Sequence, residues 1–407
     1  MNCRHCGTPL QNTVLDLGFA PPSNAYLTAE ELSRPEVYYP LKVKVCDQCW
    51  LVQTEDYATA EDLFRPDYAY FSSTSKSWLK HAARYAETMQ ALLGLDSSSF
   101  VIEIASNDGY LLKNFIAAGV PCLGIEPTDS TATVAEKNGI PVLREFFCEA
   151  LGKRLSAQGK QADLLVGNNV LAHVPNIDDF VRGLKAALKP GGVITLEFPH
   201  LMRLIEDTLF DTVYHEHFSY LSLNLICRIF TTAKLRVWKV ETLPTHGGSL
   251  RVFGCHEDDK RLTQESVINM LCEEATHGLE RIETYLGFQS RANEIKDNLL
   301  TFLIEQKRFK KKVVAYGAAA KGNTLLNYAG IKTDLLPIVY DAAKSKQGKF
   351  MPGSHIPIVS VKNMIKEKVD FVLILPWNIS DEILLQNSIM KKNGVKFLTA
   401  VPKLRFL

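Results

Sequence analysis

The sequence predicts an α/β protein with a doubly wound, largely parallel sheet, a second and smaller α/β domain, and a cysteine-rich N-terminal module. Three observations lead to this class. Apolar strand-like runs alternate with helical runs from about residue 100, a similar alternation begins near residue 311, and two Cys-x-x-Cys pairs lie within the first 49 residues. A length of 407 residues also exceeds what one hydrophobic core usually organises, so several domains are expected.

The four N-terminal cysteines, Cys3, Cys6, Cys46 and Cys49, predict a structural zinc site. Two Cys-x-x-Cys knuckles are the usual way to supply four thiolates to one tetrahedral zinc, and disulfides are not expected in a reducing cytoplasm. The alternative, a redox Cys-x-x-Cys, normally comes alone and opens a helix. Because sulfur would fill all four positions, this metal would have no place for a substrate.

The regular elements are expected in the following order. A short strand at 50–53 follows the second cysteine pair, and apolar spacing predicts a helix over 77–93. The alternating part then gives strands at 100–104, 121–125, 163–166 and 193–197, with helices at 110–118, 131–138 and 177–188. A long helical stretch from about 264 to 308 precedes further strands at 312–317, 336–341 and 371–375.

These elements divide the chain into four parts. We expect a zinc-binding module over 1–72, a central α/β domain over 73–245, a strand and helical connector over 246–309, and a C-terminal α/β domain over 310–407.

Composition and charge exclude several classes of protein. Hydrophobic residues make up 46% of the chain and charged residues 22%, which is typical of a folded protein rather than a disordered one. The 46 basic and 45 acidic side chains leave a net charge of +1, which gives no support for nucleic-acid binding. No run approaches the ~20 apolar residues of a membrane span, and the first residues lack the apolar core of a signal peptide. We therefore expect a cytoplasmic protein.

A polar loop after the first strand of the central domain predicts a cofactor site. Backbone N–H groups at such a strand-to-helix turn face the edge of the sheet where ligands bind. Glu126, 23 residues after Glu103, ends the second strand and is placed to accept hydrogen bonds from both ribose hydroxyls of an adenosine. Only one glycine of the dinucleotide fingerprint is present, which favours a nucleoside without a pyrophosphate, and S-adenosylmethionine fits. The expected cofactor-binding residues are Glu103, Ala105, Asn107, Gly109, Glu126, Pro127, Asn168 and Asn169.

The segment 214–221 is the densest cluster of proton-handling groups in the chain. His215 and His217 flank Glu216, but the His-x-His spacing is not that of a zinc protease and no third ligand is obvious. We favour acid–base chemistry, since histidine titrates near neutrality and a neighbouring carboxylate or Tyr214 can assist it. His173 follows a polar pair at the end of another strand and is expected to face the substrate.

Cationic residues beyond residue 245 are expected to contact an anionic or sugar ligand. Arg251 lies on a strand that follows a glycine turn. Lys321 and Asn323 belong to a turn at 317–323 that is similar to a phosphate-binding turn before a helix, and Lys346 adds a further charge to the same domain. The turn lacks the spacing of a P-loop, so ATP hydrolysis is not indicated.

The chain as a whole resembles the nucleotide-sugar C-methyltransferases. The resemblance rests on the two cysteine pairs and on the motifs at 103–112, 124–127, 214–220, 247–251 and 316–323. It implies a zinc-binding module, a Rossmann-like class I methyltransferase domain that uses S-adenosylmethionine, and a C-terminal domain that contacts the nucleotide sugar. The activity implied is methylation at C3 of a dTDP-linked 4-keto-deoxysugar, on the way to branched sugars.

The resemblance also implies roles for individual residues. His217 would be the base, with Tyr214, Glu216 and His173 around the reacting carbon, and either Tyr68 or Tyr70 would join them. A ketone at C4 acidifies the proton at C3, so such a base would generate an enolate that attacks the methyl group. Two alternatives remain open at this point, namely an RNA-modifying zinc-ribbon protein and an NAD-dependent oxidoreductase.

Overall fold

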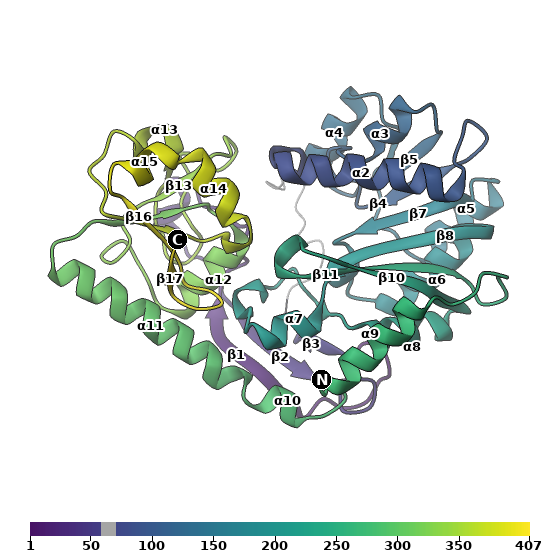
Figure 1. Ribbon diagram of the computed structural model, residues 1–407, viewed down its shortest axis with the longest axis horizontal. Helices are drawn as coiled ribbons and strands as arrows, with labels where there is room; N and C mark the ends of the chain where they lie inside the picture. Colours follow the sequence, from purple (N-terminus) through teal and green to yellow (C-terminus); the bar gives the residue numbers. More distant parts are fainter. Residues whose placement is uncertain (58–70) are drawn as a thin grey trace.

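The computed structural model describes residues 1–57 and 71–407 and, within them, three β-sheets flanked by helices (Figure 1). A four-stranded sheet belongs mainly to the N-terminal module, a seven-stranded sheet to the central domain and a six-stranded sheet to the C-terminal domain. Figure 1 places the two larger sheets on opposite sides of the molecule, with the N-terminal strands below and between them.

The N-terminal module is a small antiparallel sheet whose fourth strand comes from far along the chain. It contains β1 (Asn12–Ala20), β2 (Tyr39–Val45) and β3 (Val52–Thr54), in the order β1-β2-β3-β9. The partner of β3 is β9 (Ser219–Tyr220), which directly follows the histidine-rich segment. The strand expected at 50–53 starts two residues later, because Trp50 adopts a left-handed conformation with φ of 66°.

The central sheet has the strand order β10-β11-β8-β7-β4-β5-β6. Its parallel part is formed by β4 (Val101–Ile104), β5 (Cys122–Ile125), β6 (Val142–Leu143), β7 (Ala162–Asn168) and β8 (Leu188–Pro199). The chain order reverses between β4 and β7. Ligands of such sheets bind at this switch point, at the carboxyl ends of the strands.

Two further strands extend the central sheet, and one of them was expected elsewhere. β10 (Leu235–Leu243) and β11 (Ser249–His256) form an antiparallel hairpin, and β11 also pairs with β8. The predicted boundary at residue 245 therefore cuts through the sheet. β11 is part of it because its buried side chains, such as Leu250 and Val252, pack in the same core as Ile194.

Helices lie on both faces of the central sheet (Figure 1). They are α2 (Lys76–Leu93), α3 (Leu112–Ala117), α4 (Asp129–Lys137), α5 (Glu149–Ala157), α6 (Ile177–Ala187), α7 (Leu201–Glu206) and α8 (Leu223–Thr232). Ser75 caps the N-terminus of α2, since its hydroxyl accepts from the Trp78 N–H at 3.3 Å, and Gly94 caps the C-terminus in a left-handed conformation.

The connector is not one continuous helix. It contains α9 (Glu265–Thr276), α10 (Glu283–Leu286) and α11 (Phe288–Arg308). The first break falls at Gly278, which has a φ of 73° that side-chain-bearing residues rarely adopt. The expectation of a single helical stretch over 264–308 is wrong, because the chain turns at Gly278 between α9 and α10.

The C-terminal sheet has the order β14-β13-β12-β15-β16-β17, parallel except for its last strand. The strands are β12 (Val313–Tyr316), β13 (Val339–Asp341), β14 (Ile358–Ser360), β15 (Phe371–Ile374), β16 (Lys396–Thr399) and β17 (Arg405–Phe406). The accompanying helices are α12 (Ala320–Tyr328), α13 (Val361–Met364), α14 (Ser380–Gln386) and α15 (Ser388–Lys392). Its switch point lies between β12 and β15, so the loops after these two strands meet there.

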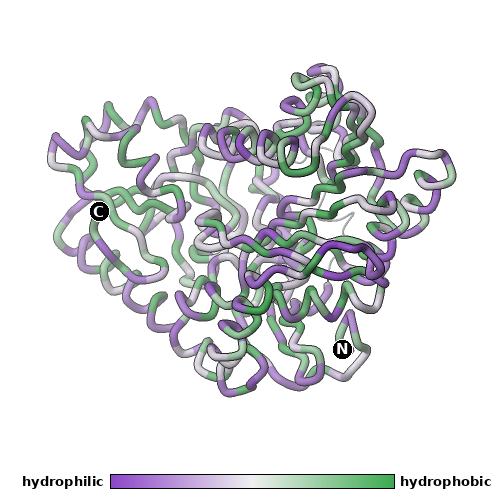
Figure 2. The backbone as a smooth tube through the Cα atoms, turned by 45° about the vertical axis from the view of Figure 1, so that its right-hand side comes forward, coloured by the Kyte–Doolittle hydropathy of each residue, from purple (hydrophilic) through white to green (hydrophobic). Residues whose placement is uncertain are grey.

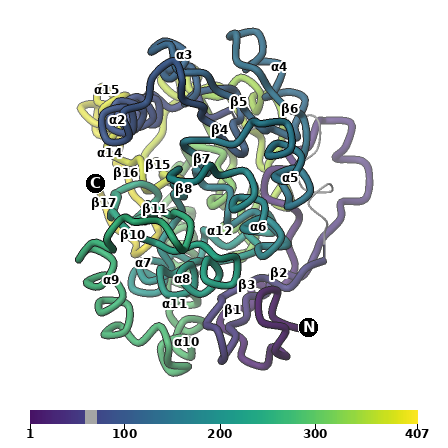
Figure 3. The backbone as a smooth tube through the Cα atoms, turned by 90° about the vertical axis from the view of Figure 1, so that its right-hand side faces the viewer, coloured from purple at the N-terminus to yellow at the C-terminus, as the bar shows by residue number. Residues whose placement is uncertain are grey.

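The N-terminal module and the C-terminal domain share one hydrophobic core. Leu15 and Leu41 of the module belong to the same buried cluster as Phe288, Leu325 and Met351. Figures 1 and 3 both place the module's strands beside α10 and α11. Figure 2 shows hydrophobic segments along the inner strands and hydrophilic ones along the outer turns. The module therefore packs against both larger domains and brings them together.

Candidate active site and zinc site

The four N-terminal cysteines meet in one place and form a zinc-binding cluster. Their Sγ atoms all lie within 4.8 Å of one another, with Cys3 to Cys49 at 3.5 Å and Cys6 to Cys46 at 3.4 Å. A tetrahedral zinc with Zn–S bonds of ~2.3 Å sets its sulfurs ~3.8 Å apart, so the donor set fits this metal. Gln53 also donates to the Cys3 sulfur at 3.3 Å, which stabilises a thiolate there. Four sulfur ligands leave no open position, and the zinc is structural.

The predicted cofactor loop lies at the switch point of the central sheet, directly after β4. Ala105 and Asn107 both have left-handed backbones, with φ of 56° and 50°. Such conformations are costly for residues other than glycine and concentrate at ligand sites. Gly109 has a φ of 77°, and a Cβ there would lie 2.0 Å from a side-chain carbon of Ile140. A side chain at position 109 would therefore displace Ile140, and the expected role of the loop in cofactor binding stays a prediction.

Glu126 ends β5 and holds this loop from one side. Its carboxylate accepts from the backbone N–H of Asn107 at 2.9 Å and of Thr128 at 3.0 Å. Pro127 lies between Glu126 and Thr128 in the chain. Glu103, at the end of β4, is 1% exposed, and burial raises its pKa well above its usual range. The two acids therefore differ in environment, with only Glu126 bonded to the backbone of the loop.

Asn168 and Asn169 lie at the end of β7, across the switch point from the cofactor loop. The Asn169 amide donates to Nε2 of His246 at 3.2 Å, and Asn168 lies 3.5 Å from the Tyr110 hydroxyl. The carbonyl oxygens of both amide side chains are buried and have no hydrogen-bond partner among residues 1–57 and 71–407. Buried polar atoms of this kind are usually bonded, so these oxygens can serve a ligand.

Two of the residues predicted to be catalytic, Tyr214 and His173, lie against the ring of His217. Its ring centre lies 3.9 Å from that of Tyr214 and 4.7 Å from that of His173. Nδ1 of His217 is 2.9 Å from the Thr212 carbonyl, and Nδ1 of His173 is 2.7 Å from the Glu216 carbonyl. A carbonyl oxygen can only accept, so Nδ1 carries the proton on both rings and Nε2 keeps its lone pair.

Burial keeps these histidines neutral. It lowers the pKa of His217 well below the usual 6.5, with a further contribution from His173, and lowers the pKa of His173 to about 4. Burial also lowers the pKa of His246 to about 4. A neutral imidazole that is protonated on Nδ1, as in His217, can accept a proton at Nε2, which is the state that a general base requires.

The N-terminal module contributes to the same site. The Asn24 amide donates to the Glu216 carboxylate at 2.7 Å, and Thr54 of β3 donates to the His217 carbonyl at 3.2 Å. His215 points away from the group, since its Nε2 lies 3.3 Å from the carbonyl of Tyr39. The contact of Asn24 with Glu216 was not expected from the sequence.

The C-terminal domain places Lys321 near the histidines. The Lys321 ammonium donates to Asn378 at 2.8 Å and lies 4.4 Å from the centre of the Trp377 ring. Burial lowers the pKa of Lys321 to about 8, and the charge of Lys321 helps to lower the pKa of both His217 and His246. The ammonium of Lys321, in the C-terminal domain, thus lies close enough to His217 and His246 of the central domain to affect their pKa.

Two other residues expected at the substrate side have different surroundings. Both polar atoms of the Asn323 side chain are buried and lack a hydrogen-bond partner in the described part of the chain. Lys346 donates to the Ala318 carbonyl at 2.7 Å and lies over the ring of Tyr26. Asn323 lies in α12 and Lys346 in the segment after β13, and their expected contacts with a substrate stay predictions.

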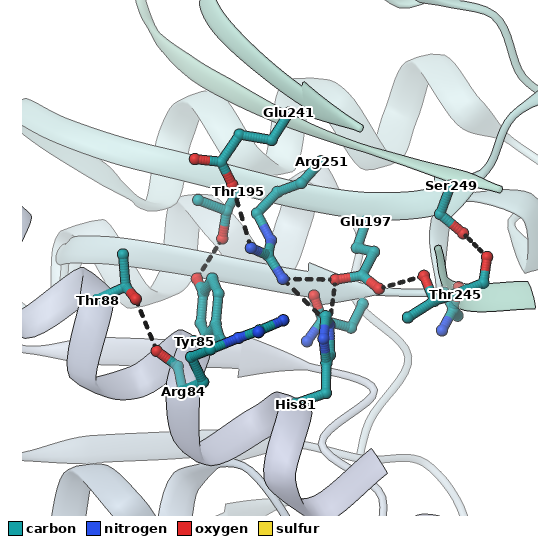
Figure 4. Close-up of polar contacts among 12 residues, drawn as sticks. His81, Arg84, Tyr85, Thr88, Thr195, Glu197, Glu241, Thr245, Ser249 and Arg251 are labelled. Atoms are coloured by element: carbon teal, nitrogen blue, oxygen red, sulfur yellow. Dashed lines mark hydrogen bonds and ion pairs between the residues drawn. The ribbon is translucent and has the colours of Figure 1, made fainter. Parts of the chain in front are cut away.

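Arg251 is part of a buried network instead of an open anion site (Figure 4). It is 6% exposed and donates to Glu197 of β8 at 2.8 Å and to Glu241 of β10 at 3.3 Å. Glu197 also contacts His81 of α2 at 2.9 Å and accepts from the Thr245 hydroxyl at 3.0 Å. The expectation that Arg251 contacts substrate is corrected here, because β11 directs its side chain into a charged cluster between α2 and the sheet.

Two expected residues cannot be placed, and two residues near the histidines were not expected. Tyr68 and Tyr70 lie outside the described residues. Asp211 and Trp377, which bond to each other at 2.7 Å, were missed. Trp377 follows a parallel strand at its carboxyl end, a position that could have marked it.

The described residues contain no helix that is long and apolar enough to cross a membrane.

Comparison with known families matches all three parts of the chain. Residues 3–64 match a putative zinc binding domain, residues 77–240 a methyltransferase domain, and residues 244–402 a C-methyltransferase C-terminal domain. With the switch-point loop of the central sheet, these matches define a methyltransferase of the class I α/β fold that uses S-adenosylmethionine. The chain belongs to the family of C-methyltransferases. It is 32% identical to C-methyltransferase NovU of Streptomyces niveus over 405 residues, covering 100% of this chain and 96% of that protein.

Other similarities are shorter. A ubiquinone biosynthesis O-methyltransferase of Bordetella avium is 27% identical over 108 residues, which cover 26% of this chain and 45% of that protein. Among solved structures, magnesium protoporphyrin IX methyltransferase from Synechocystis PCC 6803 covers 43% of this chain and 81% of its own, with 12% identity and a TM-score of 0.35. The glycopeptide N-methyltransferase MtfA covers 43% of this chain and 94% of its own, with 13% identity and a TM-score of 0.34.

Proposed function

We propose that this C-methyltransferase adds a methyl group at C3 of a dTDP-linked 4-keto-deoxyhexose, in the biosynthesis of branched deoxysugars. The observation that carries the proposal is the pair of neutral histidines, His217 and His173, whose Nδ1 atoms both donate to backbone carbonyls. Methylation of a carbon next to a ketone requires removal of a proton of low acidity. The imidazole of His217, neutral and protonated on Nδ1, can take this proton at Nε2, whereas transfer to an oxygen or nitrogen lone pair has less need of such a base.

The proposed reaction assigns a role to each residue around His217. Nε2 of His217 takes the C3 proton, and the electron pair of the C–H bond moves through C3–C4 to the ketone oxygen. Tyr214, whose ring lies against that of His217, donates a hydrogen bond to the resulting enolate oxygen. Glu216 and His173 hold the group in place, and Tyr68 or Tyr70 is proposed to complete it.

The cofactor is proposed to bind along the carboxyl ends of β4, β5 and β7. When bound, S-adenosylmethionine supplies a methyl group activated by a positively charged sulfur. The carboxylate of Glu126 accepts from the ribose hydroxyls, and the loop after β4 surrounds the amino-acid end. The residues proposed for these contacts are Glu103, Ala105, Asn107, Gly109, Glu126, Pro127, Asn168 and Asn169.

The nucleotide sugar is proposed to bind between the C-terminal domain and the histidines. Lys321, Asn323 and Lys346 are the residues proposed to contact it. Lys321 supports this assignment because its ammonium lies near His217 yet belongs to the other domain. A substrate held by Lys321 would therefore lie within reach of the base.

Proton exchange tests the proposal directly. The wild-type enzyme is incubated in D₂O with a dTDP-4-keto-deoxyhexose and S-adenosylhomocysteine, and deuterium at C3 is measured by NMR. We expect deuterium at C3, and methylation of C3 when S-adenosylmethionine replaces the product analogue. A substrate that is neither exchanged nor methylated would overturn the assignment of the acceptor. Thermal-shift measurements with RNA and with NAD examine the two remaining alternatives.

A further inference from the structure

Two side chains of the C-terminal domain donate hydrogen bonds on either side of Thr212, which lies in a single turn of 3₁₀ helix at Phe210–Thr212. Nε1 of Trp377 donates to the Asp211 carboxylate at 2.7 Å. The hydroxyl of Thr324, on α12, donates to the carbonyl of Val213 at 2.8 Å. The residue before Thr212 and the residue after it are therefore both held by the other domain.

Thr212, the residue between these two contacts, orients the ring of His217. The Thr212 carbonyl lies 2.9 Å from Nδ1 of His217, and because this oxygen can only accept, it places the proton of the ring on Nδ1. The other nitrogen, Nε2, then holds the lone pair. A rotation of the Thr212 peptide would remove this acceptor, and the ring could carry its proton on either nitrogen.

Both donors are themselves held firmly. The ring of Trp377 packs on Gly247, where a Cβ would lie 2.5 Å from a ring carbon, and the Lys321 ammonium lies 4.4 Å from the ring centre on its face. Thr324 is 3% exposed within α12. Asp211 is fully buried, so its bond to Trp377 is not exchanged readily for water.

We propose that Trp377 and Thr324 are positioning residues of the reaction. By holding Asp211 and Val213 they fix the Thr212 carbonyl and keep His217 protonated on Nδ1, so that the C-terminal domain prepares the base of the central domain. This inference rests on the proposed function, in which His217 is the base. Neither positioning residue needs to touch the substrate for this effect.

The test combines two variants with a spectroscopic measurement on the full-length protein. In Thr324→Val the hydroxyl is replaced by a methyl group of similar size, and in Trp377→Phe the indole N–H is lost. We expect ¹⁵N NMR of His217 to show protonated Nδ1 in the wild type and a mixture of tautomers in both variants. We expect kcat to fall ~10- to 10²-fold with KM for both substrates unchanged, since small misplacements of a reacting group have effects of this size.

Matched variants keep the test decisive. Thr324→Ser restores the hydroxyl and should restore both the tautomer and kcat, which excludes a general loss of folding. Thr399→Val makes the same substitution at a buried hydroxyl that has no hydrogen-bond partner among the described residues, and it should behave as wild type. If Thr324→Val has the tautomer and the kcat of the wild type, the inference is overturned. The Thr324 variants alone decide this, even if Trp377→Phe does not fold. Failure of the proposed function has a different sign: the wild-type enzyme itself would show no proton exchange at C3.

Discussion

His217 donates from Nδ1 to the carbonyl of Thr212, five residues earlier in the chain, at 2.9 Å. The same histidine has its own carbonyl bonded to Thr54 of the N-terminal module, and its ring lies against Tyr214. Two parts of the chain thus fix His217: the segment at 212–214 contacts its ring, and the N-terminal module holds its backbone. A side chain held in this way needs little reorganisation before it accepts a proton, which is what preorganised catalytic groups achieve.

Replacement of the base should stop both exchange and methylation. His217→Asn keeps an acceptor and donor of similar shape but has no basic nitrogen, so we expect turnover to fall by at least ~10²-fold. Deuterium exchange at C3 should fall with it, because both processes need the same enolate. Glu216→Gln, which retains the acceptor for Asn24, should have a smaller effect. Normal exchange in His217→Asn would mean that another group, with His173 the first candidate, removes the proton.

The value of kcat/KM should fall when the pH rises above about 8. Burial lowers the pKa of Lys321 to about 8, so this side chain loses its positive charge as the pH rises through that value. If the charge is needed for substrate binding, kcat/KM should fall above about pH 8. Lys321→Arg keeps the charge at higher pH and should move the limit upward. An identical limit in this variant would assign it to another group.

Cofactor affinity should depend on Glu126. In Glu126→Gln one carboxylate oxygen becomes an amide nitrogen, which cannot accept from a ribose hydroxyl or from the N–H of Asn107. We expect S-adenosylmethionine binding to weaken by about 1–3 kcal/mol, as for the loss of a charge-assisted hydrogen bond. Isothermal titration calorimetry measures this loss. Unchanged affinity would place the ribose away from the end of β5.

Removal of zinc should affect the reaction although the metal does not touch the substrate. We expect one zinc per chain by elemental analysis, and Cys46→Ser should lower both zinc content and melting temperature. Because β3 of this module pairs with β9, next to His217, activity should fall as well. Cys272→Ser, at an exposed cysteine outside the cluster, is the control and should change neither quantity. A fully active protein without metal would contradict the role given to the four thiolates.

Arg251 should contribute to stability rather than to substrate binding. Arg251→Met leaves Glu197, which is fully buried, with His81 as its remaining ionic partner. We expect the free energy of unfolding to decrease by about 3 kcal/mol, which is typical when one partner of a buried ion pair is removed. Arg144→Met breaks exposed pairs with Asp129 and Glu136 and should cost less than ~1 kcal/mol. Chemical denaturation measures both. A large rise in KM with unchanged stability would instead support a substrate contact.

Part of the site could be located from the sequence because its residues are marked by patterns within short segments of the chain. Glu103 lies near the carboxyl end of one buried parallel strand and Glu126 directly follows its neighbour, and the carboxyl ends of neighbouring parallel strands always lie at the same edge of a sheet. The histidines near residue 217 were conspicuous because they are close together in the chain. Asp211 and Trp377 are separated by 166 positions, and no local pattern connects them.

The sequence by itself determined the alternation of strands and helices, the two sheets that follow from it, and the four cysteines that bind zinc, since periodicity and ligand spacing act between near neighbours in the chain. The tertiary structure decided that β9 completes the sheet of the zinc module, that β11 belongs to the central sheet, and that Arg251 pairs with Glu197. It also brought Lys321 near the histidines of another domain and Trp377 to Asp211 of that domain. These partners depend on which buried surfaces pack together, and long-range packing is a property of the whole chain that no short segment encodes.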